Sequence, residues 1–436
     1  MSKLQDKLNL IEKDKIKKKF DAIESANQGL STKEKLEKLV NLNLKREKIR
    51  ENSQPFQRKE SSQDLEPQID PERDKPYLTR EYSYSLQTLY GNIPLSDWYR
   101  VTGEHLAVIF GDDECLPISP QKLVFFDTET TGLAGGTGTI PFMLGFGYFD
   151  NEWFRVKVFL LNDLAREDEF LDAVDQFLEE HEFTGTVTYN GKSFDFPLME
   201  TRYILQRKRF PLLRFPHMDF LFAARTIWKN TYESRKLGYL GDILLGISRD
   251  DDIDASQIPM IYFNYLRSKS FGILQKVVEH NALDLLGLAG ILLRALKYQE
   301  DFVHTSDEGE IYGTGKLKEK YGNLEEAGRL YEWLAQRATR EEIKALAVKA
   351  LADLKKRKKL FHEASELWQM IECSSDRHVL KELSIHFEHR EKNYFKALEY
   401  VRRALENFSL SEAQRIDFEK RMKRLSQKMK SIEKEE

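Results

Sequence analysis

One apolar stretch that ends in two acidic residues constrains the fold of this chain most strongly. The stretch runs Leu123-Val-Phe-Phe-Asp127-Thr-Glu129-Thr-Thr-Gly-Leu133. Its aromatic and branched residues predict a buried strand, in which residues two apart point to the same face. A carboxylate pair at the end of a core strand is costly unless a cation offsets the charge, and a divalent ion is the simplest such cation. Taken alone, the stretch is also compatible with a turn at Asp127 and a solvated Glu129.

Length and composition predict a folded protein of two or three domains. The chain has 436 residues, of which 41% are hydrophobic, so it can bury a sizeable core. The net charge of −4 neither requires nor excludes a polyanionic partner.

Cys115 and Cys373 lie far apart, which argues against a disulfide framework or a zinc site and favours a reducing compartment. No apolar run reaches the ~18 residues of a membrane span and no export signal is visible, so we expect a cytoplasmic protein without membrane contact.

Composition divides the chain into four segments. Residues 1–76 are rich in charged residues, Gln and Ser, which predicts a mobile or helical segment, solvated or serving as a nucleic-acid tether. Residues 77–300 carry the patterns of a folded domain with a lead-in. Residues 301–316 include Asp307-Glu-Gly-Glu and Gly313-Thr-Gly315 and are predicted to be a linker. Residues 317–430 have a helical composition.

The helical segment contains an internal repeat. Ala327, Ala364 and Ala397 are each followed by apolar or aromatic residues three and four positions later. Their spacing is close to the ~34 residues of a tetratricopeptide array, in which a small residue lets paired helices approach. A generic helical bundle is the alternative. Either arrangement offers a surface for a protein partner.

The middle segment predicts an α/β fold with a mixed sheet. Two apolar runs, 140–149 and 153–161, flank the hairpin turn Asp150-Asn-Glu, so together with the acidic strand they predict three antiparallel strands. A helix over 167–180 and a strand over 184–189 follow. Strands that are first antiparallel and then joined through a helix describe a mixed sheet flanked by helices. Further helices are predicted at 220–228, 237–245, 258–266 and 273–296.

Two more acidic residues lie at the start of, or within, predicted core elements. Asp195 follows the strand 184–189, and Asp284 shares one face of the last long helix with His280. Taken singly, such residues are usually structural. Together with Asp127 and Glu129 they form a set suited to phosphodiester hydrolysis, in which carboxylates hold two divalent ions about 3.5–4 Å apart. Carboxylate ligands suit Mg²⁺ or Mn²⁺.

The ordered motifs resemble the DEDD 3′–5′ exonucleases, which have a ribonuclease H-like fold. They are Asp127-Thr-Glu129-Thr-Thr-Gly, then Asn190 followed by Phe194-Asp195, then His280-x-x-x-Asp284. The bacterial YprB-like branch of that superfamily is more closely similar, and some members carry a tetratricopeptide-like C-terminal part. The motifs of that branch are Tyr189-Asn-Gly-Lys-Ser-Phe-Asp-Phe-Pro197, His217-Met-Asp219, Ile258-Pro and His280-Asn-Ala-Leu-Asp284. The resemblance covers roughly residues 123–296.

The resemblance implies a role for each acidic residue. Asp127 would bridge two metal ions, Glu129 and Asp284 would complete the site that activates water, and Asp195 would support the second ion. His280 would orient or deprotonate the attacking water. Three residues separate His280 from Asp284, whereas exonucleases with a histidine base usually have four, which leaves the role of His280 open.

Five neighbouring residues are candidates for substrate binding or support: Thr130, Asn190, Lys192, His217 and Asp219. Lys192 would contact a phosphate or be a surface lysine in a turn. His217 and Asp219 would support the metal ligands or cap local structure.

These observations predict a metal-dependent nuclease that acts on nucleic acid, at a single-stranded 3′ end if the resemblance holds. The alternative is a nuclease-derived binding protein that has lost catalysis and acts as a scaffold through its helical repeats. A phosphatase of the haloacid dehalogenase type is disfavoured, because its motif requires Asp at the position of Glu129. The choice between DNA and RNA leaves no short motif, because it depends on contacts with the 2′-hydroxyl.

Overall fold

The structure is a computed structural model that describes residues 74–132, 138–247, 252–297, 307–372, 376–407 and 410–432. The chain divides into two compact units, one within residues 1–224 and 232–300 and the other within 225–231 and 301–436. All but the last three residues of the predicted N-terminal segment, 1–76, lie outside the described ranges.

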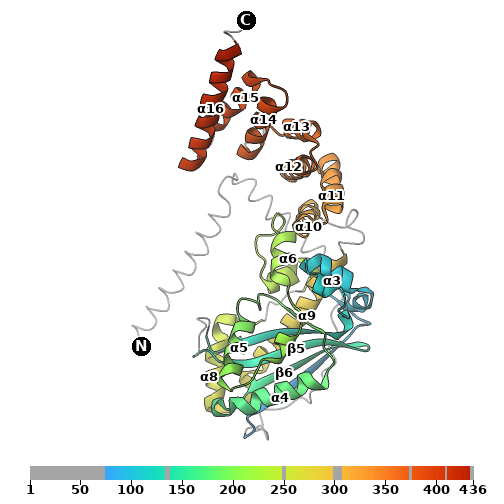
Figure 1. Ribbon diagram of the computed structural model, residues 1–436. Helices are drawn as coiled ribbons and strands as arrows, with labels where there is room; N and C mark the ends of the chain where they lie inside the picture. The colour runs from blue at the N-terminus through green and yellow to red at the C-terminus, as the bar shows by residue number, and fades with distance from the viewer. Residues whose placement is uncertain are drawn as a thin grey trace, which may run out of the picture. The chain divides into compact units, whose positions relative to one another are not determined.

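A six-stranded mixed sheet forms the centre of the first unit (Figure 1), in the order β1-β6-β5-β4-β7-β8. Strands β1, β6, β5 and β4 are antiparallel neighbours, whereas β7 is parallel to β4 and β8 is parallel to β7. The strands are β1 (Tyr77–Ser85), β4 (Leu123–Thr130), β5 (Pro141–Asp150), β6 (Trp153–Leu161), β7 (Gly185–Thr188) and β8 (His217–Asp219). The predicted mixed sheet is therefore confirmed, and β1 and β8 are two strands that the sequence pattern did not indicate.

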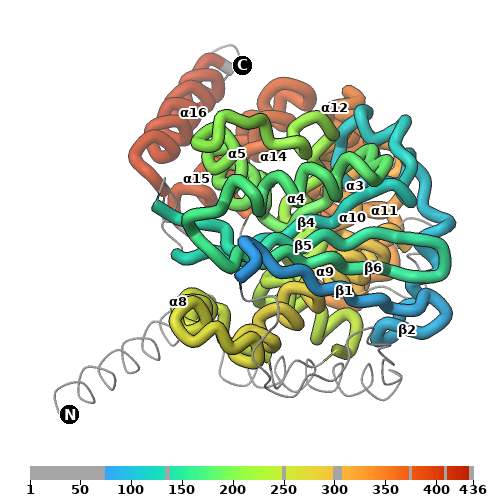
Figure 2. Tube along the Cα trace, turned by 90° about the horizontal axis from the view of Figure 1, so that it is seen from below, coloured from blue at the N-terminus to red at the C-terminus, as the bar shows by residue number. Residues whose placement is uncertain are grey.

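Helices α4 (Glu167–Glu180) and α5 (Asp195–Leu205) pack against one face of the sheet (Figure 2). Phe126 of β4 contacts Phe196 of α5, with ring centroids 6.1 Å apart. A buried ion pair joins the two helices, with Arg202 Nε 2.6 Å from Glu167 Oε1. Because Asp195 is the first residue of α5, this pair also restrains the position of that carboxylate.

Helix α9 (Gln275–Lys297) packs against the opposite face and is buried along most of its length. A glycine on β5 allows the close approach. A Cβ atom at Gly145 would lie only 1.9 Å from Asn281 Oδ1 of α9, whereas one at Gly147 would lie 2.7 Å from Phe154 Cζ on the neighbouring strand β6. A larger residue at Gly145 would therefore force α9 away from the sheet, and one at Gly147 would displace the ring of Phe154.

The remaining elements of the first unit connect or cover the sheet. They include the two-stranded pair β2 (Leu89–Tyr90) and β3 (Ile93–Pro94), and the helices α3 (Gly103–Phe110), α7 (Leu237–Leu240) and α8 (Ile258–Ser268). Helix α6 (Phe220–Ile227) begins in the first unit, and its last three residues belong to the second. Short 3₁₀ helices cover Leu95–Arg100, Asp113–Cys115, Pro120–Lys122, Leu164–Arg166, Pro211–Arg214, Ala255–Gln257 and Phe271–Ile273, and a π-helical turn covers Gly241–Leu245.

The second unit is all-helical, and each of its helices packs against the next (Figure 1). Its helices are α10 (Glu308–Lys320), α11 (Leu324–Arg337), α12 (Glu341–Arg357), α13 (Phe361–Met370), α14 (Arg377–His389), α15 (Tyr394–Asn407) and α16 (Glu412–Ile432). The repeated alanines Ala327, Ala364 and Ala397 are all fully buried. The region is therefore a stack of helices, and its assignment as tetratricopeptide repeats stays a prediction.

Residues 307–316, the described part of the predicted linker over 301–316, differ from the prediction. From Glu308 onwards the chain forms helix α10. The glycines that suggested a flexible connection serve close packing instead, since a Cβ atom at Gly313 would lie 2.0 Å from the carbonyl oxygen of Ile227. A glycine pattern alone does not distinguish a loop from a tightly packed helix, because both need the small residue.

Among the helices of the described residues, none combines the length and the apolar composition that a membrane crossing requires.

Candidate active site

The topology of the sheet brings Asp127, Glu129 and Asp195 together. Asp127 and Glu129 lie two apart on β4 and therefore on one face. Because β7 runs parallel to β4, its C-terminal end and the turn that follows lead to the same edge of the sheet. Helix α5 begins there with Asp195, and the Thr128 hydroxyl donates a hydrogen bond to its Oδ1 at 2.5 Å.

Helix α9 brings the other two predicted residues from the opposite direction. His280 Nε2 lies 3.5 Å from Asp284 Oδ2, one helical turn away, and 3.9 Å from Glu129 Oε1 on β4. The Asn281 amide donates a hydrogen bond of 2.8 Å to Asp127 Oδ2. The structure thus places Asp127, Glu129, Asp195, His280 and Asp284 in one site, which is built from β4, α5 and α9.

The site is buried and crowded with acidic side chains. Burial raises the pKa of Asp127 well above its usual range, and the charges of Asp195, Asp284 and Glu129 raise it further, while the Asn281 hydrogen bond opposes them. Burial also raises the pKa of Glu129 to about 8, although His280 counteracts it. For Asp195, burial raises the pKa to about 6 against the hydrogen bond from Thr128. These carboxyl groups therefore need protons or cations to be stable together.

The donor set fits hard divalent cations. Carboxylate oxygens, which Mg²⁺ and Mn²⁺ prefer, come from Asp127, Glu129, Asp195 and Asp284. These carboxylates repel one another, and bound cations would offset that repulsion. No three potential ligand atoms of these acids lie within 4.8 Å of one another. Among the described residues, such a group of three occurs in another part of the chain. Hydrogen bonds hold two of the carboxylates in place although like charges repel. Asn281 donates to Asp127, and Thr128 donates to Asp195.

Without divalent ions, the folded protein should lose stability as the pH rises from about 5 to about 8. Glu129 and Asp195, with pKa values of about 8 and about 6, are protonated in the folded chain where unfolded carboxyl groups are ionised. The unfolded state then binds fewer protons, so the free energy of unfolding falls with rising pH. We expect the Tm in EDTA to fall by about 5 °C or more across this range, and Mn²⁺ to remove most of the decrease.

Calorimetric or fluorescence melts in EDTA and in Mn²⁺ test this expectation. Glu129→Gln is the matched variant, because it keeps the shape of the side chain and removes one of the two groups that titrate. Its Tm in EDTA should depend less on pH than that of the wild type. A wild-type Tm in EDTA that stays constant between these pH values would contradict the electrostatic account.

Two residues that the sequence did not single out complete the site. Asp252 Oδ1 lies 2.7 Å from His280 Nδ1, and Asn281 holds Asp127. Burial lowers the pKa of His280, but Asp284, Asp252 and Glu129 outweigh it and the net pKa is raised. Asp252 belongs to a run of acidic residues with no defined spacing to His280, and Asn281 lies inside the predicted motif without a distinguishing pattern.

Asp219 organises the turn that leads to Asp195. Its Oδ1 accepts hydrogen bonds from the backbone N–H of Asn190 at 2.8 Å and of Leu221 at 3.1 Å, and its Oδ2 accepts one from Lys192 N–H at 3.0 Å. Asn190 has a left-handed backbone with φ of 75°, a conformation that asparagine tolerates well. Asp219 therefore caps local structure, and the side chain of Lys192 is exposed.

His217 and Thr130 also make structural contacts. His217 Nε2 is 2.8 Å from Thr188 Oγ1, and its ring stacks on Phe196 with centroids 3.6 Å apart. Burial, together with Lys192, lowers the pKa of His217 to about 3, so its ring is neutral near pH 7. The Thr130 hydroxyl donates to the carbonyl oxygen of Gly132 at 2.9 Å and shapes the end of β4.

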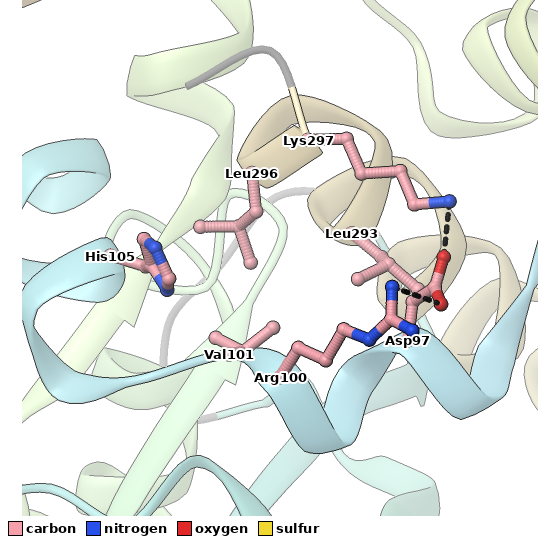
Figure 3. A pocket seen from close by; sticks show the side chains of 7 residues that line it. All are labelled: Asp97, Arg100, Val101, His105, Leu293, Leu296 and Lys297. Carbon is pink, nitrogen blue, oxygen red and sulfur yellow. Dashed lines mark ion pairs between the residues drawn. The ribbon is translucent and has the colours of Figure 1, made fainter. Parts of the chain in front are cut away.

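A separate hollow lies at the C-terminal end of α9 (Figure 3) and is lined by Asp97, Arg100, Val101, His105, Leu293, Leu296 and Lys297. Asp97 forms an ion pair with Lys297 and lies 3.8 Å from Arg100 Nη1. These contacts tie the 3₁₀ helix Leu95–Arg100 to α9. The hollow therefore belongs to the packing between these two elements.

Comparison with known proteins agrees with this geometry. Residues 124–295 match the family model of the RNase H superfamily. The uncharacterized protein YprB of Bacillus subtilis (strain 168) is 31% identical over 376 residues, which are 82% of this chain and 87% of that protein. The chain belongs to the YprB family. Because the alignment with YprB is longer than the RNase H match, this family likeness extends beyond the RNase H domain. Membership of the RNase H superfamily suggests hydrolysis of nucleic-acid phosphodiesters.

Proposed function

We propose that this protein is a metal-dependent nuclease that removes nucleotides from the 3′ end of a nucleic-acid strand. The observation that carries the proposal is the meeting of four acidic side chains with His280 at one edge of an RNase H domain. Asp127, Glu129, Asp195 and Asp284 would hold two Mg²⁺ or Mn²⁺ ions. When bound, such ions neutralise phosphate oxygens and stabilise the leaving alkoxide.

In this proposal His280 accepts a proton from the attacking water. Its Nδ1 faces Asp252 at 2.7 Å, which fixes the tautomer with the proton on that nitrogen. In the neutral ring, its Nε2, directed toward Glu129 and Asp284, is then the acceptor. The contact with the Asp252 carboxylate orients the imidazole ring before the reaction begins. Asp252 is in this account a positioning residue.

An exposed aromatic ring beside the acids supports a single-stranded substrate. Phe194 directly precedes Asp195 and is 58% exposed, although a large apolar side chain is normally buried. Bases of a single strand stack on such rings with little sequence preference. The exposed Lys192, in the same turn, offers a positive charge for a phosphate.

The proposal is tested with the purified full-length protein and 5′-labelled single-stranded DNA and RNA, in Mg²⁺, Mn²⁺ or EDTA. We expect a ladder of products that shorten stepwise from the 3′ end, in the presence of a divalent ion only. A circular single strand of the same composition is the matched control and should remain intact. Cleavage of the circle would indicate an endonuclease. Binding without any hydrolysis would favour the scaffold alternative.

A further inference from the structure

A second cluster of metal-binding residue types lies in the all-helical unit. His362, His386 and Glu391 each offer one ligand atom, and the three atoms lie within 4.8 Å of one another. His362 is the second residue of α13, and His386 lies in the last turn of α14. The two imidazole rings are 5.4 Å apart and nearly perpendicular, so the start of α13 lies beside the end of α14.

The end of α14 folds Glu391 back onto His386. The carbonyl oxygen of His386 accepts hydrogen bonds from the backbone N–H of Arg390 at 2.8 Å and of Glu391 at 3.4 Å. Lys392 then takes a left-handed conformation with φ of 56°, which turns the chain toward α15. As a result, Glu391 Oε1 lies 3.1 Å from His386 Nε2.

We propose that His362, His386 and Glu391 form a binding site for a transition-metal ion of the zinc class, which links the start of α13 to the end of α14. Two imidazoles and one carboxylate are ligands typical of zinc. Three protein ligands leave a fourth position for water. No residue of this set takes part in the proposed nuclease chemistry, so the site is independent of that function.

The distances are close to what such an ion requires. Ligand atoms about 2.0–2.2 Å from a tetrahedral zinc ion are about 3.3–3.6 Å from one another. The 3.1 Å between His386 and Glu391 is near this value. His362 is exposed, so its ring can rotate to shorten its own distances without disturbing a core.

Burial holds one of the three ligands in place. His386 is only 4% exposed, whereas His362 and Glu391 are exposed. The nitrogen ligands also separate this site from the acids of the RNase H domain, because Mg²⁺ prefers oxygen ligands.

The test uses the full-length protein, stripped of metal and kept in excess Mg²⁺ so that Zn²⁺ binding to the acids is suppressed. Calorimetric titration with Zn²⁺ should show one equivalent bound. His362→Gln and Glu391→Gln should each weaken it by at least about tenfold. His389→Gln is the matched control, because His389 lies on α14 with its side chain 53% exposed and is outside the cluster. It should bind as the wild type does.

Two further measurements distinguish metal binding at this cluster from metal binding at the acids and from a loss of folding. Co²⁺ in place of Zn²⁺ should give the visible absorption of a tetrahedral complex in the wild type and in Asp127→Asn, but not in His362→Gln. Far-ultraviolet circular dichroism should show the same helix content in all variants, because the two substituted ligands are exposed. Zn²⁺ affinity and Co²⁺ absorption that are unchanged in His362→Gln and Glu391→Gln would overturn the proposal.

Discussion

Replacing Asp127 with Asn is expected to reduce hydrolysis by about 10³-fold or more, because this carboxylate interacts with each of the other acids of the site. The substitution preserves the size of the side chain. It also removes a buried acid whose ionisation is opposed by burial and by the neighbouring carboxylates, so the Tm without metal should stay the same or rise slightly. Turnover of a labelled single strand and thermal melts in EDTA measure the two effects.

Metal-dependent stability provides the control for this variant. Divalent ions that bind only the folded state raise the Tm by mass action, and Asp127→Asn should show a smaller increase with Mn²⁺ than the wild type. Asp150→Asn is the matched control, since Asp150 lies at the end of β5 and pairs with Arg155 outside the site. A response to Mn²⁺ as large as that of the wild type would count against Asp127 as a metal ligand.

Replacing His280 with Asn should lower turnover by ~10²–10⁴-fold, the usual contribution of a positioned general base. The four carboxylates remain, so the Tm increase with Mn²⁺ should be preserved. Asp284→Asn, one helical turn away, should impair both turnover and the response to metal. Near wild-type turnover in His280→Asn would show that the short spacing to Asp284 has removed the histidine from the mechanism.

The pH profile distinguishes a base from a merely structural histidine. A base must be neutral, so the rate should rise with pH through the pKa of His280. Asp252 contributes to raising that pKa. In Asp252→Asn the rise should therefore move to lower pH, and turnover should fall by about tenfold because the ring is less well oriented. An unchanged profile in this variant would contradict the role of Asp252 as a positioning residue.

Local periodicity in the sequence determined much of the fold and of the acidic site. The two-residue period of a strand places Asp127 and Glu129 on one face, and the helical period places His280 and Asp284 on one face. Helix α4 has the predicted bounds, Glu167–Glu180. These features depend on residues that are close together in the chain, so a sequence pattern is enough to indicate them.

Only the tertiary structure decided how the acidic site is supported. Asn281 holds Asp127 across 154 positions of the chain, and Asp252 holds His280 across 28. The three residues of β8 are too few for a two-residue period to be recognised. The glycines of α10 look like those of a linker in the sequence, because the residues they pack against lie elsewhere in the chain. Contacts of this kind leave no local pattern, because the partners meet only after the sheet and its helices have packed together.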